Sequence, residues 1–77
     1  MRIRVTTYGF AGRLLEASGR PVDIELPEGA TATQVISALE IDSEEIALVT
    51  VNGRRTAEGA RLSPGDHVRL FAPVGGG

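Results

Sequence analysis

The fold is decided by the stretch 62-LSPGDHVRLFAPVGGG-77. Its segment 63–66 is typical of a tight turn, because proline presets one backbone angle and glycine tolerates unusual ones. Residues 67–71 then alternate in character, as a half-buried strand does. Pro73 cannot donate a ladder hydrogen bond and predicts the end of that strand. We therefore expect a last strand that runs directly into a flexible glycine-rich tail over residues 72–77.

Strand patterns also occur earlier in the chain. Residues 2–7 and 22–26 alternate, and an apolar, β-branched run over 47–51 predicts a central strand. Asn52-Gly53 favours a two-residue turn and a short returning strand over 54–56. The side chains expected to face the core are Ile3, Val5, Thr7, Val22, Ile24, Leu26, Val68 and Leu70. Those expected on the opposite face are Arg2, Arg4, Thr6, Asp23, Glu25, Arg69 and Phe71, where the charged groups should form cross-strand ion pairs.

A helix is predicted between the second and third strands, over residues 32 to about 40. Thr31 is a suitable N-cap, and Gln34 stands at the spacing of a capping box. The apolar residues follow the spacing i, i+3, i+4 and i+7, which places one stripe on the core: Ala32, Val35, Ile36 and Leu39.

Two connections are also expected to contain short helical turns. One lies near residues 11–17, where Leu14 and Leu15 should dip into the core, and the other lies in the polar loop 42–45. The element order β-β-α-β-β-β predicts one α+β domain over residues 1–77. Its sheet should be mixed, with four to five strands and the main helix packed across one face.

Composition excludes several functions. The chain has 77 residues and a net charge of −2, its basic residues are all arginine, and cysteine is absent. Thiolate nucleophiles, disulfides and thiolate metal sites are therefore excluded, and no basic patch for nucleic acid or membrane is expected. His67 has no partners for catalysis or metal binding in the sequence and is expected at the surface. We expect a cytoplasmic protein without an autonomous catalytic site.

The chain resembles the β-grasp, ubiquitin-like sulfur carriers, of which the small subunit of molybdopterin synthase (MoaD type) and the thiazole-pathway carrier (ThiS type) are examples. The resemblance is carried by four segments: Phe10-Ala11, Val51-Asn52-Gly53, 62–68 and 71–77. It implies that the first and last strands lie side by side and parallel in the middle of the sheet. Ala72 departs from the molybdopterin type, which usually has a second proline there, and Gly75 is closer to the thiazole type. The long first connection and the Leu70-Phe71 ending are closer to the molybdopterin type, which is the type that the chain resembles most.

The resemblance implies a function for the tail. The carboxylate of Gly77, next to Gly76, would be adenylated by an E1-like enzyme of the MoeB or ThiF type and converted to a thiocarboxylate. Sulfur would then pass to an acceptor on a MoaE-type large subunit or a thiazole synthase. ATP and Mg²⁺ would be supplied at the activating enzyme, sulfur would come from a donor protein, and the carrier itself would bind no cofactor.

Partner binding is expected around the tail, at Phe71, Pro73, Val74 and Gly75. Tyr8 and Phe10 should lie at the same end of the sheet, and an exposed aromatic patch there would be a docking surface. The alternative for at least one of these two is burial in the core. Three other functions stay open: a thiazole-type or other sulfur-metabolite carrier, a protein modifier joined through Gly77, and an interaction module with an inert tail. Without lysine, the chain cannot form isopeptide-linked chains on itself.

Overall fold

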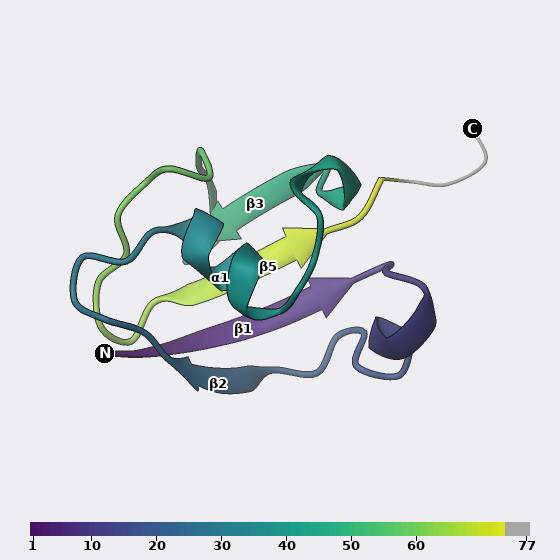
Figure 1. The fold of residues 1–77 in the computed structure, drawn as a ribbon, viewed down its shortest axis with the longest axis horizontal. Helices are drawn as coiled ribbons and strands as arrows, with labels where there is room; N and C mark the ends of the chain where they lie inside the picture. The colour runs from purple at the N-terminus through teal and green to yellow at the C-terminus, as the bar shows by residue number, and fades with distance from the viewer. Residues whose placement is uncertain (74–77) are drawn as a thin grey trace.

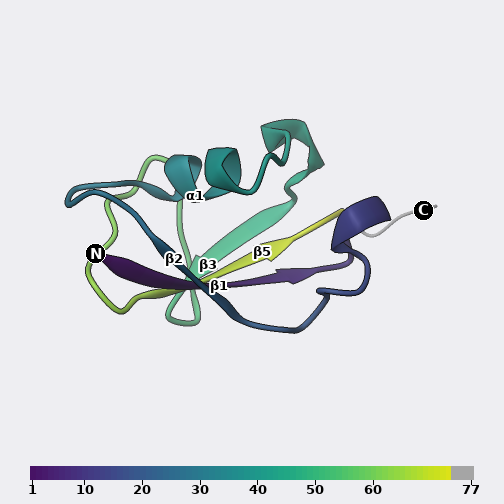
Figure 2. The same cartoon turned by 60° about the horizontal axis from the view of Figure 1, so that its bottom comes forward.

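A computed structural model describes residues 1–73, except for the side chain of Arg13. A five-stranded sheet has the order β2-β1-β5-β3-β4, and α1 crosses one of its faces (Figures 1 and 2). The elements are β1 (Arg2–Tyr8), the 3₁₀ turn η1 (Gly12–Leu14), β2 (Val22–Glu25), α1 (Ala32–Ala38), the 3₁₀ turn η2 (Ser43–Glu45), β3 (Leu48–Val51), β4 (Arg54–Arg55) and β5 (His67–Phe71). The predicted α+β class, mixed sheet and single main helix are confirmed.

The middle of the sheet is a parallel pair, β1 beside β5. The register runs from Arg4 opposite His67 to Tyr8 opposite Phe71. The other neighbours, β2 on β1 and β3 on β5, are antiparallel. Both central strands therefore end at the same edge of the molecule, where η1 and η2 also lie (Figure 1).

The core lies between α1 and the sheet. Its largest fully buried side chains come from β1, β5 and α1: Ile3, Val5, Val68, Leu70, Val35 and Ile36. The N-terminus of α1 is capped as predicted, because the Thr31 N–H donates to Gln34 Oε1 at 3.0 Å. The helix ends two residues earlier than expected, since Glu40 has a φ of 57° and the Ile41 N–H bonds back to the Ile36 carbonyl at 3.1 Å.

Two turns are joined at the opposite end of the sheet. Asn52 and Gly53 have φ values of 53° and 84°, as the predicted two-residue turn requires. Asn52 Nδ2 donates to Asp66 Oδ1, and the His67 N–H donates to Asn52 Oδ1, each at 2.9 Å. Asp66 Oδ2 also accepts from the Ser63 N–H at 2.7 Å. The β3–β4 turn and the turn before β5 are therefore held together.

Three predicted side-chain positions are wrong. Val22 was expected inside but is 46% exposed, because it begins the edge strand β2. Leu15 was expected to dip into the core but is 65% exposed, whereas Leu14 packs against the core. His67 was expected at the surface but is half-buried, with its Nε2 2.7 Å from Thr6 Oγ1. Thr6, the partner in that contact, lies on the outer face as expected and is buried.

Candidate functional site

The tail begins with Ala72 and Pro73, here called the stem. Hydrogen bonds on both sides of β5 hold the point where the stem begins. The Ala72 N–H donates to the Tyr8 carbonyl at 3.0 Å, and the Ala47 N–H donates to the Phe71 carbonyl at 2.8 Å. Pro73 follows and is exposed. The parallel ladder therefore continues through Ala72, so the expected flexible tail starts with a residue that is still tied to the sheet. Val74, Gly75, Gly76 and Gly77 lie outside the described residues.

An aromatic pair lies beside this stem. The rings of Tyr8 and Phe71 stack with centroids 4.8 Å apart and planes 10° from parallel, and both residues are half-buried. They extend the face that carries Arg4 and Thr6, away from α1, as expected for Phe71. Phe10 is only 4% exposed and belongs to the core, so the alternative of burial is the one that holds for this ring. Partner binding by these aromatic residues stays a prediction.

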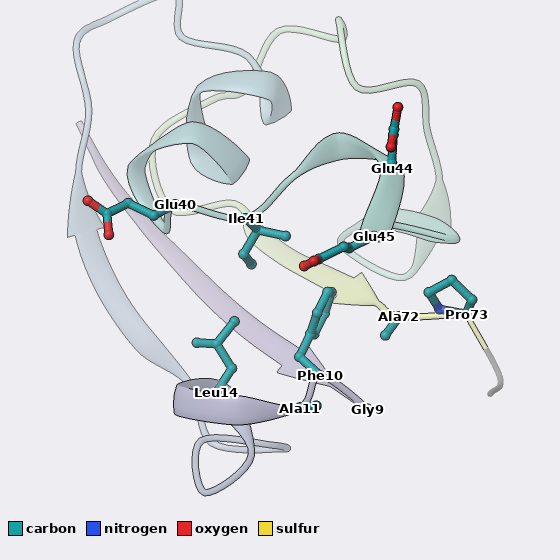
Figure 3. Close-up of a pocket in the computed structure, with 10 residues that line it drawn as sticks. All are labelled: Gly9, Phe10, Ala11, Leu14, Glu40, Ile41, Glu44, Glu45, Ala72 and Pro73. Carbon is teal, nitrogen blue, oxygen red and sulfur yellow. The ribbon is translucent and has the colours of Figure 1, made fainter. Parts of the chain in front are cut away.

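A groove opens on the helix side of the same edge (Figure 3). Its volume is about 420 Å³, and it is lined by η1 and the three residues before it, the segment after α1, η2 and the stem. Gly9 has a φ of 80° and turns the chain out of β1, so that the ring of Phe10 reaches the floor of the groove. The apolar lining consists of Phe10, Ala11, Leu14, Ile41, Ala72 and Pro73, and the acidic lining of Glu40, Glu44 and Glu45.

The side chains of the groove do not all point into it. Figure 3 shows Phe10, Leu14 and Ile41 converging on the floor, with the carboxylate of Glu45 directed over them. The carboxylates of Glu40 and Glu44 point away from the floor (Figure 3). The groove therefore presents an apolar floor with one carboxylate above it and two more at its margin.

The outer face of the sheet has the expected ion pairs. Arg2 Nε lies 3.2 Å from Glu25 Oε1, and Arg4 Nε lies 3.1 Å from Asp23 Oδ1. These pairs are exposed and add little stability. Burial lowers the pKa of His67 below its usual value, and Arg69 and Arg4 lower that pKa further, while Asp23 opposes the shift. Most of the charged side chains on this face therefore form ion pairs between β1 and β2.

Residues 1–73 contain no group of three or more histidine, aspartate or glutamate side chains placed to hold a metal ion. No helix in this part of the chain is long and apolar enough to cross a bilayer. The described part of the site is thus a stem, an aromatic pair and a groove, with Tyr8, Phe10, Phe71 and Pro73 gathered at one edge. The groove was missed from the sequence because its walls come from three distant segments.

Solved structures with the same fold include small proteins from archaea. SAMP1, a small archaeal modifier protein from Haloferax volcanii, is 25% identical, with a TM-score of 0.73 and 100% of both chains covered. A candidate molybdopterin converting factor, subunit 1, from Pyrococcus furiosus is 30% identical, with a TM-score of 0.68, covering 95% of this chain and 98% of that one. The ubiquitin of Caldiarchaeum subterraneum is 20% identical, with a TM-score of 0.61, covering 100% and 98%.

The last of these likenesses concerns the fold alone, which is the ubiquitin-like β-grasp. No curated protein matches the sequence. The model of the ThiS family matches residues 9–77, so it spans the stem, the groove segments and the glycine run. The family resemblance predicted from the sequence is therefore confirmed, and the chain belongs to the ThiS family.

Proposed function

We propose that the chain is a sulfur carrier whose reactive group is the carboxylate of Gly77. The observation that carries the proposal is the course of β5. In a chain of the ThiS family, this central strand leads through the hydrogen-bonded Ala72 and exposed Pro73 into the glycine run. A rigid sheet thereby positions the start of a segment without bulky side chains, which suits insertion into the narrow active site of another protein.

The proposed reaction has two steps at Gly77. The carboxylate attacks the α-phosphate of ATP, pyrophosphate leaves, and an acyl-adenylate forms on an E1-like enzyme that holds the ATP and Mg²⁺. Hydrosulfide then displaces AMP and leaves a thiocarboxylate; a persulfide can replace it if a thiol afterwards reduces the S–S bond. Transfer of the sulfur to an acceptor, with water supplying an oxygen, regenerates the carboxylate.

Molybdopterin synthesis is the pathway that we favour. It is supported by the 30% identity with the candidate molybdopterin converting factor subunit over nearly the whole chain. In that pathway the partners would be a MoeB-type activating enzyme, a MoaE-type large subunit and a sulfur donor protein. A thiazole-pathway role, with a ThiF-type activating enzyme and thiazole synthase, is the alternative within the same chemistry.

The test is the intact mass of the protein after incubation with an E1-like enzyme, ATP, Mg²⁺ and sulfide. We expect one terminal oxygen to be replaced by sulfur. Two variants serve as controls: one lacks Gly77, and one carries two alanines after Gly77, so that the glycine carboxylate is blocked. Both should fold and neither should gain sulfur. An unchanged mass for the unmodified chain with both MoeB-type and ThiF-type enzymes would overturn the proposal.

A second candidate function is the modification of other proteins through Gly77. It is favoured by the 25% identity with the archaeal modifier protein over the full length of both chains. Trypsin would cleave after Arg69, the last basic residue, and leave residues 70–77 on a modified lysine. Recovery of such branched peptides from a cell extract, after activation with ATP, would support this function. If these peptides are absent although the thiocarboxylate forms, sulfur transfer is the only one of the two functions that is supported.

A further inference from the structure

We propose that the groove binds a partner segment in which an apolar side chain stands next to arginine or lysine. This inference rests on the proposed function, because it concerns how a carrier is recognised by the proteins that handle its tail. The groove is continuous with the stem, since Ala72 and Pro73 line it. A segment seated there would lie directly beside the point where the tail leaves the sheet.

The groove favours an apolar side chain because its floor is apolar. Phe10 and Ile41 are nearly fully buried, and Leu14 is half-buried, so each shows the groove only part of its surface. Together with Ala11 and Ala72 they form a shallow apolar depression rather than an enclosed cavity. One aliphatic side chain is well matched to it, because removal of that side chain and the floor from water is favourable.

The cationic part of the preference follows from the rim. Glu44 and Glu45 are both exposed and lie in the first turn of η2. Neither of these glutamates takes part in the ion pairs at the β1–β2 side of the sheet. With Glu45 directed over the floor, the rim attracts a cation and disfavours an anionic segment.

The negative charge of the rim also distinguishes between possible occupants of the groove. The chain's own residues 74–77 follow Pro73, which lines the groove. If they occupied it, their terminal carboxylate would be brought toward Glu44 and Glu45, which opposes that arrangement. A second copy of the chain would have to offer exposed arginine beside an apolar residue. Its arginines at β1 are already paired, and Arg20, two residues before the exposed Val22, is the candidate that the concentration series below tests.

The experiment uses the ¹⁵N-labelled full chain and three short peptides, Ac-GRLRG-NH₂, Ac-GELEG-NH₂ and Ac-GRGRG-NH₂. The arginine–leucine peptide should shift amide signals of residues 9–14, 40–45 and 72. Affinity should fall when glutamate replaces arginine, when glycine replaces leucine, and at high salt. Shifts centred on the outer face of the sheet, equal shifts with all three peptides, or no shifts at millimolar peptide would each overturn the proposal.

A matched pair of variants tests the rim. Glu44→Gln with Glu45→Gln should weaken binding of the arginine–leucine peptide roughly three- to tenfold. Glu16→Gln with Glu28→Gln makes the same change in net charge at exposed positions outside the groove and should leave affinity unchanged. Equal losses in both variants would mean that only overall charge matters, and the proposal would fail.

The other occupants are separate outcomes. If deletion of residues 74–77 shifts the groove signals and strengthens peptide binding, the tail is the occupant and the proposal is wrong. Groove shifts that grow with protein concentration alone would assign the groove to a second copy. Peptide binding needs neither ATP nor sulfide, so its failure is distinguishable from failure to form a thiocarboxylate.

Discussion

Tyr8 and Phe71 stack face to face at the last register pair of the parallel ladder, with ring centroids 4.8 Å apart. The two stacked rings cover the outer face of the sheet next to the stem. A double-mutant cycle of Tyr8→Ala and Phe71→Ala should give a coupling of about 0.5–1.5 kcal/mol in the free energy of unfolding. The same cycle with Tyr8→Ala and Val22→Ala should be additive, because the exposed Val22 pairs with Val5, whose side chain is on the opposite face of β1 from Tyr8. A coupling near zero for the aromatic pair would show that the rings act independently.

Proline in place of Ala72 should destabilise the fold. Proline would remove the N–H that donates to the Tyr8 carbonyl at 3.0 Å. We expect Ala72→Pro to lower stability by about 1 kcal/mol, whereas Ala72→Ser keeps the donor and should be nearly neutral. Thermal unfolding measures both, and an equal melting temperature for the proline variant would contradict the role given to this bond.

Asn52 combines a left-handed backbone with two side-chain hydrogen bonds. Asn52→Ala loses both bonds and adds backbone strain, so we expect a cost of about 2–3 kcal/mol in chemical denaturation. Asn52→Gly relieves the strain but not the lost bonds, and it should be less costly by about 1 kcal/mol. If alanine and glycine were equally costly, strain at this φ would be negligible.

His67 should make stability depend on pH. Because the pKa of His67 is lowered in the folded state, the unfolded chain binds the proton more tightly, and stability rises with pH in this range. Acidification from about pH 7.5 through the normal histidine pKa of about 6.5 and below should therefore destabilise the fold. This destabilisation by His67 is largest below the folded-state pKa and absent at high pH.

The measurement compares unfolding of the parent chain and of His67→Gln at a series of pH values. The difference between their stability curves isolates His67 from the carboxylates, and an NMR titration of its ring gives the folded-state pKa directly. Parallel curves for the two proteins would contradict the prediction, and so would a ring pKa above 6.5.

The parts of the fold that could be predicted are those with a local cause. The strand over 67–71 was predicted with its observed bounds, because alternation and Pro73 act within a few residues. The Thr31 cap was likewise predictable from Thr31 and Gln34 alone. Val22 and His67 were misplaced because their burial depends on which strand lies at the edge and which side chain lies across the ladder.

The candidate site shows the same division. Phe71 could be assigned to the end of the last strand and Pro73 to the stem from their order in the chain. Phe10 could be described only by two alternatives, because burial of this ring depends on how the connection after β1 folds over the sheet. The groove needed Leu14, Ile41 and Ala72 to meet, and no period in the sequence links residues so far apart.

The parallel pairing of β1 and β5 has a mechanical consequence. The two strands run in the same direction through the middle of the sheet, and the N-terminus and the stem lie at opposite ends of it (Figure 1). A force applied between Arg2 and Pro73 is therefore directed along the strands and loads their hydrogen bonds together in shear, rather than breaking them one at a time. A protein that pulls on the stem works against the most resistant direction of the sheet.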